Sequence, residues 1–398
     1  MLTALLLHGA LFVGFICVYG RWLDEEVTAD VCLFGLLIEL VSATWLVKYV
    51  HAMDCFFYLH LGTPLAALDL FSLDLALCFD EVSAVFLAVL ALALVLCFFF
   101  LAEYFEYDAN ASTIVTLSAL FSQTALLYFC AFDLCTLIFL WEAISIISFL
   151  LVQHWAFRVS SYKAGLKVFT VSQLGDLPFF LFLFCLLARL HTSALAEILP
   201  LLPLLTFEYV FLGGLCVQLL TILGVCLQLA IFLKAAQWFF YPWLLDAMEA
   251  PVPISAQLHS STLVVIGFYL FFRFQAVFEL APATSTLAVL AGFATSVGAS
   301  ILGFFQEDGK KLLACSTASQ LGYVIVALGL HLYSEAVYLL VFCCCNKACT
   351  FVWFGVLMRR YAGVSDFRLV AGLGLTWVEH AGLAVAVANF TVFPGAFC

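Results

Sequence analysis

Charged residues are scarce in this chain. Lys and Arg together number 14 and Asp and Glu 26, which makes 10% of 398 residues. Hydrophobic residues make up 66%, and the mean hydropathy is +1.18. A soluble domain of this length needs far more charge on its surface, so the composition predicts an integral membrane protein. The formal net charge of −12 argues against nucleic acid as a partner.

Motifs for cofactors and metals are also missing. The sequence has no glycine-rich phosphate loop and no dinucleotide-binding fingerprint. Its eight histidines do not show the paired spacing of haem-binding membrane helices. The 16 cysteines lack the two-and-two spacing of a zinc site and lie mostly in apolar runs, where cysteine is usually a small buried hydrophobe. We therefore expect no metal, NADH, flavin or iron–sulfur cluster in this chain.

Apolar runs of membrane-spanning length recur along the chain. The alternating pattern of a membrane barrel is absent, so the prediction is an all-α, polytopic membrane protein of about 12 transmembrane helices. The predicted spans are 2–20, 31–50, 82–102, 112–132, 134–152, 164–188, 209–240, 254–278, 283–305, 312–331, 334–357 and 374–393. The long span 209–240 is expected to be broken, and 55–79 to lie at the membrane interface. The first span lacks a basic leading region and a cleavage site, so we expect it to be retained.

Basic residues divide unevenly between the two sides of this topology. One side carries Arg21, Arg158, Lys163, Lys310, Lys311, Arg359, Arg360 and Arg368, and the other carries Lys48, Arg189 and Arg273. The side richer in Lys and Arg is normally the cytoplasmic or matrix side. The N-terminus is therefore expected on the opposite side.

Four ionisable residues lie inside predicted spans, where a charge costs several kcal/mol and is rarely present by accident. They are Glu142, Asp176, Lys234 and Lys347. Such residues mark ion paths or proton relays or, alternatively, structural pairs that stabilise helix packing. Movement of protons or small cations through the bilayer is therefore the leading hypothesis for function.

The most informative of these residues is Lys234, which follows the uncharged run Leu220–Leu233. Pro242, Pro251 and Pro253 then interrupt helical continuity. A discontinuous helix is a known way to build an ion site at membrane depth, so the pattern around Lys234 predicts an ion path.

His259 opens the next apolar run, followed by Ser260, Ser261 and Thr262. Histidine can gain and lose a proton near neutral pH, and hydroxyl groups offer relay partners. A lone histidine is more often a packing residue, so both interpretations remain open. The lysine upstream favours the relay.

Lys163 and Lys167 share a helix face, whereas Lys167 and Asp176 are about half a turn out of phase. Lys167 and Asp176 should therefore each have a partner elsewhere. Lys163 is expected either to reach the interface or to join the path. Glu39 and Asp133, in or near spans, are weaker candidates for an ion path.

Three motifs resemble a known family. They are Lys234-Ala-Ala-Gln237 with Asp246-Ala-Met-Glu249 and His259-Ser-Ser-Thr262, then Gln306 to Tyr323, and Trp141-Glu142 followed by Gln173-Leu-Gly175-Asp176. Their order and spacing over residues 70–395 resemble the antiporter-like membrane subunits of NADH:ubiquinone oxidoreductase, respiratory complex I. The first motif favours the mitochondrial chain 5 type. Subunits of sodium/proton antiporters share the pattern.

The resemblance implies inverted antiporter-like repeats. The expected parts are N-terminal helices 1–110, a first repeat 111–280 and an incomplete second repeat 281–398. Glu142 and Lys234 would form a charge pair assisted by Asp176, and His259 would link that pair to Lys347. The predicted proton-transfer residues are Glu142, Lys234, His259, Lys347, Asp176 and Lys167.

The resemblance also implies partners and a location. The other membrane-arm subunits of complex I would be neighbours, and NADH, FMN, iron–sulfur clusters and ubiquinone would bind in partner subunits. The location would be the mitochondrial inner membrane, among its lipids, with the N-terminus on the intermembrane-space side. The 43 Phe and 16 Cys are typical of a thymine-rich organellar genome.

The chain departs from the family pattern in three places. Gln173 stands where an arginine is common, Cys343 stands where a histidine is usual, and the sequence stops at Cys398, where the family continues into another lysine. We expect a separate polypeptide to supply the missing helices. Two alternatives stay open: a subunit of a multi-subunit cation/proton antiporter, and a membrane-arm scaffold that does not pump.

Overall fold

The computed structural model describes residues 25–53, 56–62, 75–106, 108, 110–212, 215–260, 262–361, 363–370, 376, 380, 382 and 384. Within these residues, nine helices are long and apolar enough to cross a membrane. They are α2 (Glu25–Met53), α3 (Glu81–Tyr104), α4 (Ala111–Tyr128), α5 (Leu134–Val152), α6 (Val159–Leu190), α10 with α11 (Val252–Ser260 and Leu263–Arg273), α13 (Pro282–Phe304), α14 (Gly309–Gly329) and α15 (Tyr333–Arg360). The predicted all-α polytopic fold is confirmed.

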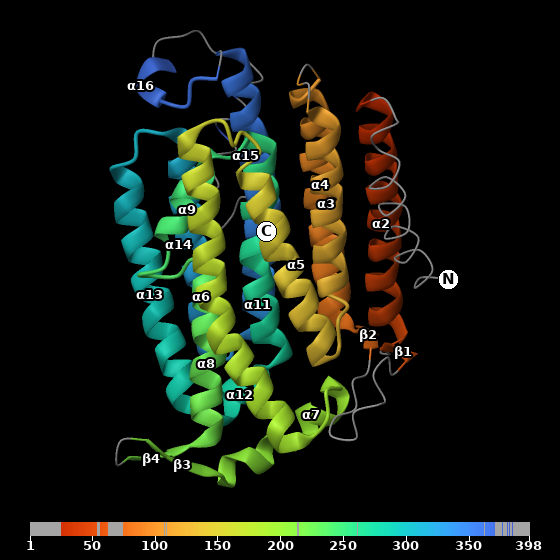
Figure 1. Cartoon of the computed structure of the whole chain (residues 1–398), viewed down its shortest axis with the longest axis vertical. Coiled ribbons are helices and arrows are strands. Elements are labelled where there is room, and N and C mark those ends of the chain that lie inside the picture. The colour runs from red at the N-terminus through yellow and green to blue at the C-terminus, as the bar shows by residue number, and fades with distance from the viewer. Residues whose placement is uncertain are drawn as a thin grey trace.

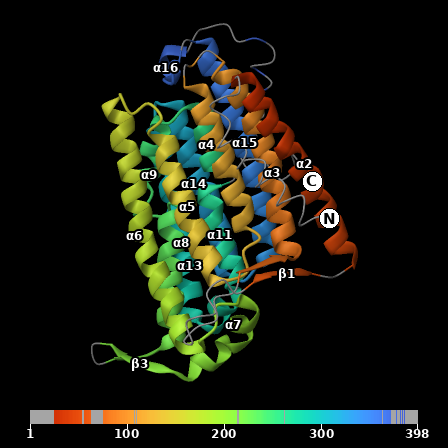
Figure 2. The same cartoon turned by 45° about the vertical axis from the view of Figure 1, so that its right-hand side comes forward.

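The long helices stand side by side in one bundle (Figures 1 and 2). Two short antiparallel hairpins lie at one end of it, and α16 (Phe367–Val370) lies at the other (Figure 1). The first hairpin pairs β1 (Phe57–Gly62) with β2 (Leu75–Phe79), and the second pairs β3 (Tyr209–Leu212) with β4 (Leu215–Gln218). The short helices α7 (Leu195–Leu201) and η1 (Leu202–Phe207) lie at the hairpin end.

Large apolar side chains cover the outside of the bundle. Phe304 is 90% exposed, Phe139 72% and Leu290 71%. Monomeric soluble proteins rarely leave such side chains in contiguous patches, whereas lipid tails solvate them. The outer surface therefore fits the hydrocarbon core of a membrane, as the hydropathy predicts.

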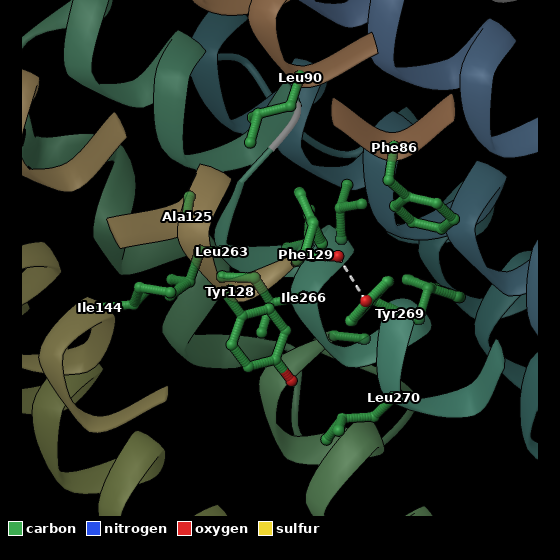
Figure 3. Close-up of a cluster of buried hydrophobic side chains, with 14 of the residues drawn as sticks. Phe86, Leu90, Ala125, Tyr128, Phe129, Ile144, Leu263, Ile266, Tyr269 and Leu270 are labelled. Atoms are coloured by element: carbon green, nitrogen blue, oxygen red, sulfur yellow. Dashed lines mark hydrogen bonds between the residues drawn. The ribbon is translucent and has the colours of Figure 1, made fainter. Parts of the chain in front are cut away.

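Aromatic rings pack together in the interior of the bundle, among them those of Phe86, Phe129 and Tyr269 (Figure 3). The ring centroids of Phe86 on α3 and Tyr269 on α11 are 5.4 Å apart, and those of Phe129 and Tyr269 are 5.0 Å apart. The Tyr269 hydroxyl donates a hydrogen bond of 2.5 Å to the carbonyl of Phe129. Arg273, one turn further, donates to the Tyr269 hydroxyl and pairs with Asp80, the N-cap of α3. These contacts join α3, the end of α4 and α11.

The predicted long span 209–240 is divided in a way the sequence did not predict. At its start, Tyr209–Leu212 and Leu215–Gln218 pair as the hairpin β3–β4. The sequence did not reveal this because an apolar hairpin and an apolar helix have the same hydropathy. The rest of the predicted span begins with α8 (Leu219–Lys234), an apolar helix of 16 residues that is shorter than the nine spanning helices, followed by α9 (Pro242–Asp246) and η2 (Ala247–Glu249). The expected break in this span is present.

The span predicted over 254–278 also contains breaks. It consists of α10, α11 and the short α12 (Gln275–Leu280). After α10, the Thr262 hydroxyl donates to the carbonyl of Gln257, a local bond that competes with helical continuation. The predicted span 2–20 lies outside the described residues, as does most of 374–393. The division into parts 1–110, 111–280 and 281–398 stays a prediction.

Candidate functional site

Lys234 is the last residue of α8, in the interior of the bundle. The chain after it leaves the helical path, since Ala236 and Phe239 have positive φ angles of 50° and 75°. Residues other than glycine rarely adopt such angles, and they cluster at functional sites. The carbonyl end of a helix carries partial negative charge, which favours an ammonium group there. The broken helix thus holds Lys234 at a C-terminal helix end.

The Lys234 ammonium is buried, with 2% of the residue exposed. It donates a hydrogen bond to the Ser145 hydroxyl on α5 and lies 4.5 Å from the centre of the Trp141 ring. In the described part of the chain it makes no direct ion pair with Glu142 or Asp176, although both acids act on it through space. A hydroxyl and an aromatic face therefore hold the cation.

Trp141, whose ring lies beside Lys234, also contacts one of the two acids. The indole Nε1 of Trp141 donates a hydrogen bond of 2.5 Å to Asp176, whose other carboxyl oxygen has no partner in the described protein. Glu142 accepts a hydrogen bond of 3.1 Å from Gln173, and its charge and that of Asp176 act on each other. Like charges this close repel, and Lys234 is the cation that offsets them.

Gly175 explains how Asp176 comes close to Lys234. A Cβ atom at this position would lie 3.1 Å from the Cβ of Leu233, the residue before Lys234. The absence of a side chain lets α6 approach α8 at this level. Asp176, the next residue on α6, is thereby placed beside the lysine end of α8.

His259 on α10 lies between Trp243, which contacts the chain next to Lys234, and Phe351, which follows Lys347 on α15. Its ring is 6.3 Å from Trp243, whose Nε1 bonds to the carbonyl of Leu233. On another side the ring is 6.5 Å from Phe351, one turn after Lys347 on α15. Both ring nitrogens are buried without a hydrogen-bond partner among the described residues. Such atoms are the ones an internal water would bind.

Lys347 is buried at 2% exposure and donates a hydrogen bond of 2.7 Å to the Ser316 hydroxyl on α14. Ser316 also lines a cavity of about 370 Å³ between α13 and α14. The other lining residues are Ala299, Ser300, Gly303, Phe304, Leu312, Ser319, Gln320 and Tyr323. The cavity therefore opens next to the hydrogen-bond partner of Lys347.

The remaining predicted residues lie elsewhere. Lys167 forms an ion pair with Asp246 on a partly exposed face, apart from Asp176, as the helix phase predicts. Lys163 is exposed. Asp133 is the N-cap of α5 and accepts hydrogen bonds from the backbone of Ala76 and Thr136. Burial raises its pKa, and these hydrogen bonds oppose the rise. The contacts of Asp133 are those of a helix cap.

Three residues that contact the charged groups directly were not predicted to do so from the sequence. They are Trp141, Ser145 and Ser316. A signal was available for two of them: Ser145 lies one helical turn after Trp141, on the same face. Nothing in the sequence marked Ser316 as a partner for Lys347. Within the described ranges, no group of three or more His, Cys, Asp and Glu side chains is placed to hold a metal.

Residues 131–392 match the model of the transmembrane family described as NADH:quinone oxidoreductase/Mrp antiporter. The chain belongs to this family. Its curated relatives include NADH-ubiquinone oxidoreductase chain 5 of Metridium senile, 30% identical over 92% of this chain, and of Dictyostelium discoideum, 25% identical over 98%. The predicted resemblance to chain 5 is confirmed. The chain spans 59% and 58% of the lengths of these two relatives.

Two solved structures share the fold. The Mrp complex from Dietzia sp. DQ12-45-1b superimposes with a TM-score of 0.78 at 22% identity, over 98% of this chain and 46% of that one. A chain of the archaeal membrane-bound sulfane sulfur reductase does so with a TM-score of 0.78 at 19% identity, over 98% and 76%. The antiporter-like fold implied by the sequence is confirmed.

Proposed function

We propose that this chain conducts protons through the mitochondrial inner membrane as a membrane-arm subunit of an NADH:ubiquinone oxidoreductase. The observation that carries the proposal is the buried line of Lys234, His259 and Lys347, which crosses three helices. Ionisable groups buried at membrane depth are costly and are retained where ions move.

The acids beside Trp141 control Lys234 in this mechanism. When Glu142 and Asp176 both carry charge, the ammonium form of Lys234 is stabilised through space. A proton arriving on one acid, or a movement of α5 against α8, weakens that stabilisation. Lys234 then releases its proton, and the local break after α8 lets its surroundings adjust.

The proton moves from Lys234 toward His259 and then toward Lys347. Each step needs a bridging water, because Trp243 and Phe351 flank the imidazole and its nitrogens have no protein partner among the described residues. Histidine suits the middle position, since it exchanges a proton near neutral pH. The cavity beside Ser316 supplies access to Lys347. Lys167 has a secondary role in this proposal, on the partly exposed face of α6.

The redox cofactors and ubiquinone belong to partner subunits in this proposal. A second polypeptide packs over the cavity between α13 and α14, where Phe304 is 90% and Tyr323 50% exposed. The N-terminus and the hairpin end of the bundle face the intermembrane space. Cys216 in β4 is exposed at that end, so a charged maleimide should label it in mitoplasts. Labelling of Cys216 only in inverted vesicles would show that the hairpin end faces the matrix instead.

The proposal is tested by NADH-driven proton translocation in membranes that contain the assembled complex with Lys234→Ala. Removing a positioned proton carrier should slow translocation by about a hundredfold. The exposed Lys163→Ala variant is the matched control and should translocate as wild type. Full translocation by Lys234→Ala would favour a non-pumping scaffold. Translocation driven by a sodium gradient without NADH would favour the antiporter alternative.

A further inference from the structure

A second buried acid lies outside the central line, on the edge helix α2. Glu39 is 1% exposed, although α2 lies at the side of the bundle next to α3 and α4 (Figures 1 and 2). One carboxyl oxygen accepts a hydrogen bond of 2.5 Å from the side-chain amide of Gln123 on α4. The other oxygen is buried and has no partner in the described protein.

No cation accompanies Glu39 in the described residues. The helix α4 has no charged residue, and α3 has only Glu81 and Glu103, close to its two ends. On α2 itself the following cation is Lys48, nine residues later, or about 13 Å along the helix axis. Burying an ionised carboxylate without a cation costs far more than burying the neutral acid. The surroundings of Glu39 are therefore those of a group that binds a proton.

A packing role alone does not explain this choice of side chain. A buried glutamine at position 39 would fill almost the same volume and keep a hydrogen bond with Gln123, without a buried acid. An acid differs from that amide chiefly in its ability to take up and release a proton.

Polar groups continue from Glu39 toward the interior. Ser122, next to Gln123 on α4, accepts a hydrogen bond of 2.7 Å from the side chain of Gln257 on α10. The Gln257 amide also donates to the carbonyl of Ser118, and its own side-chain oxygen is buried without a partner among the described residues. Gln257 lies two residues before His259 on the fully buried helix α10. One hydrogen bond thus joins α2 to α4 at Gln123, and a second joins α4 to α10 at the neighbouring Ser122, two residues before the central histidine on α10.

We propose that Glu39 is a lateral proton-binding site, held by Gln123, that exchanges protons with the central line through the Ser122–Gln257 contact between α4 and α10. This inference rests on the proposed function, because it assigns the site a proton path to serve. The ligand is the proton itself. The carboxyl O–H bond forms on uptake from a bridging water and breaks on release to such a water, which the unpartnered oxygens of Glu39 and Gln257 can bind.

The test is infrared difference spectroscopy on membranes that contain the assembled complex, comparing the resting state with NADH-driven turnover. A protonated carboxyl gives a carbonyl band that shifts in D₂O. We expect a band that changes on turnover in wild type, is lost in Glu39→Gln and is retained in Glu81→Gln, whose acid is exposed. Proton translocation should fall severalfold in Glu39→Gln only.

Gln123→Leu is a second variant that keeps the acid and removes its hydrogen-bond partner. We expect its carbonyl band to shift in frequency, so the test remains decisive if Glu39→Gln does not assemble. An unchanged band in both variants would overturn the proposal. A band lost in Glu39→Gln with translocation at the wild-type rate would also overturn it, since Glu39 would then serve no path.

Lys234→Ala measured in parallel separates this inference from the proposed function. If Lys234→Ala blocks translocation and Glu39→Gln does not, the lateral site is wrong and the proposed function stands. If Lys234→Ala translocates normally, the proposed function fails, whatever the infrared band of Glu39 does.

Discussion

In the described residues, Lys234 is held by the Ser145 hydroxyl and the Trp141 ring, without an ion pair to Glu142 or Asp176. This arrangement differs from a closed ion pair, in which direct contact would fix the proton on the lysine. A lysine bound to neutral groups responds to changes in the charge of Glu142 and Asp176, since nearby charges act strongly through a medium of low dielectric constant. Ser145 and Trp141 therefore keep Lys234 able to release its proton.

Ser145→Ala tests this view of the lysine. Losing a hydrogen bond to a charged group costs about 2 kcal/mol, so we expect proton translocation to slow by more than about tenfold. Ser148→Ala is the matched control, because Ser148 is also buried on α5 but donates only to the carbonyl of its own helix. Equal rates in the two variants would show that the Ser145 contact does not matter for transfer.

Substitution of Asp80 tests how much its ion pair with Arg273 stabilises the fold. Burial alone would raise the pKa of this carboxyl, but Arg273 beside it outweighs burial, and the pKa is lowered. A lowered pKa stabilises the fold above the unfolded-state value, and this stabilisation is lost as pH falls through the folded-state value. Asp80→Asn should cost about 3 kcal/mol at neutral pH, because it leaves the buried Arg273 unpaired.

Thermal unfolding of the detergent-solubilised complex across a pH series measures this cost. The gap between Asp80→Asn and wild type should close as the pH becomes acid. Asp366→Asn, which removes one of two acidic partners of the largely exposed Arg368, should leave the unfolding temperature unchanged. A gap that does not depend on pH would contradict the assignment to the Asp80 charge.

The helices themselves could be predicted well where hydropathy determines them. The span predicted over 134–152 has the bounds of α5, and that over 283–305 is displaced by one residue from α13. The break after α8 could be anticipated from the prolines, but its position depends on positive φ angles at Ala236 and Phe239, which no composition reveals. Hydropathy also could not distinguish the hairpin at 209–218 from helix.

Gly298→Ala tests how α13 supports the break after α8. A Cβ atom at Gly298 would lie 1.9 Å from the ring of Trp238, whose backbone N–H bonds to the Thr295 hydroxyl. We expect a loss of about 1–3 kcal/mol in thermal unfolding from overpacking, with slower translocation because the break carrying Lys234 shifts.

Gly303→Ala is the control for this variant on the same helix. Its added Cβ would lie 3.5 Å from the Cβ of Cys315, an ordinary contact, so the thermal unfolding of this variant should stay near wild type. If Gly298→Ala and Gly303→Ala have the same unfolding temperature, the packing of Trp238 on α13 does not support the break.

For the whole molecule, sequence reasoning predicted which ionisable residues are buried better than it predicted their contacts. Lys234, His259, Lys347 and Asp176 are all buried, as a membrane location requires. The charge pair of Glu142 with Lys234 stays a prediction, and the direct contacts of Lys234 with Ser145 and Trp141 depend on which helix faces meet, which is set by tertiary packing. Lys167 lies apart from the line for the same reason.

The most direct test of the account is a structure of the native membrane assembly that contains this chain, at a resolution that places waters around Lys234. We predict NADH-oxidising subunits in the same particle and a continuous line of waters linking Glu142, Lys234, His259 and Lys347. If the assembly comes from membranes that translocate protons and its interior holds no waters along this line, the account is contradicted.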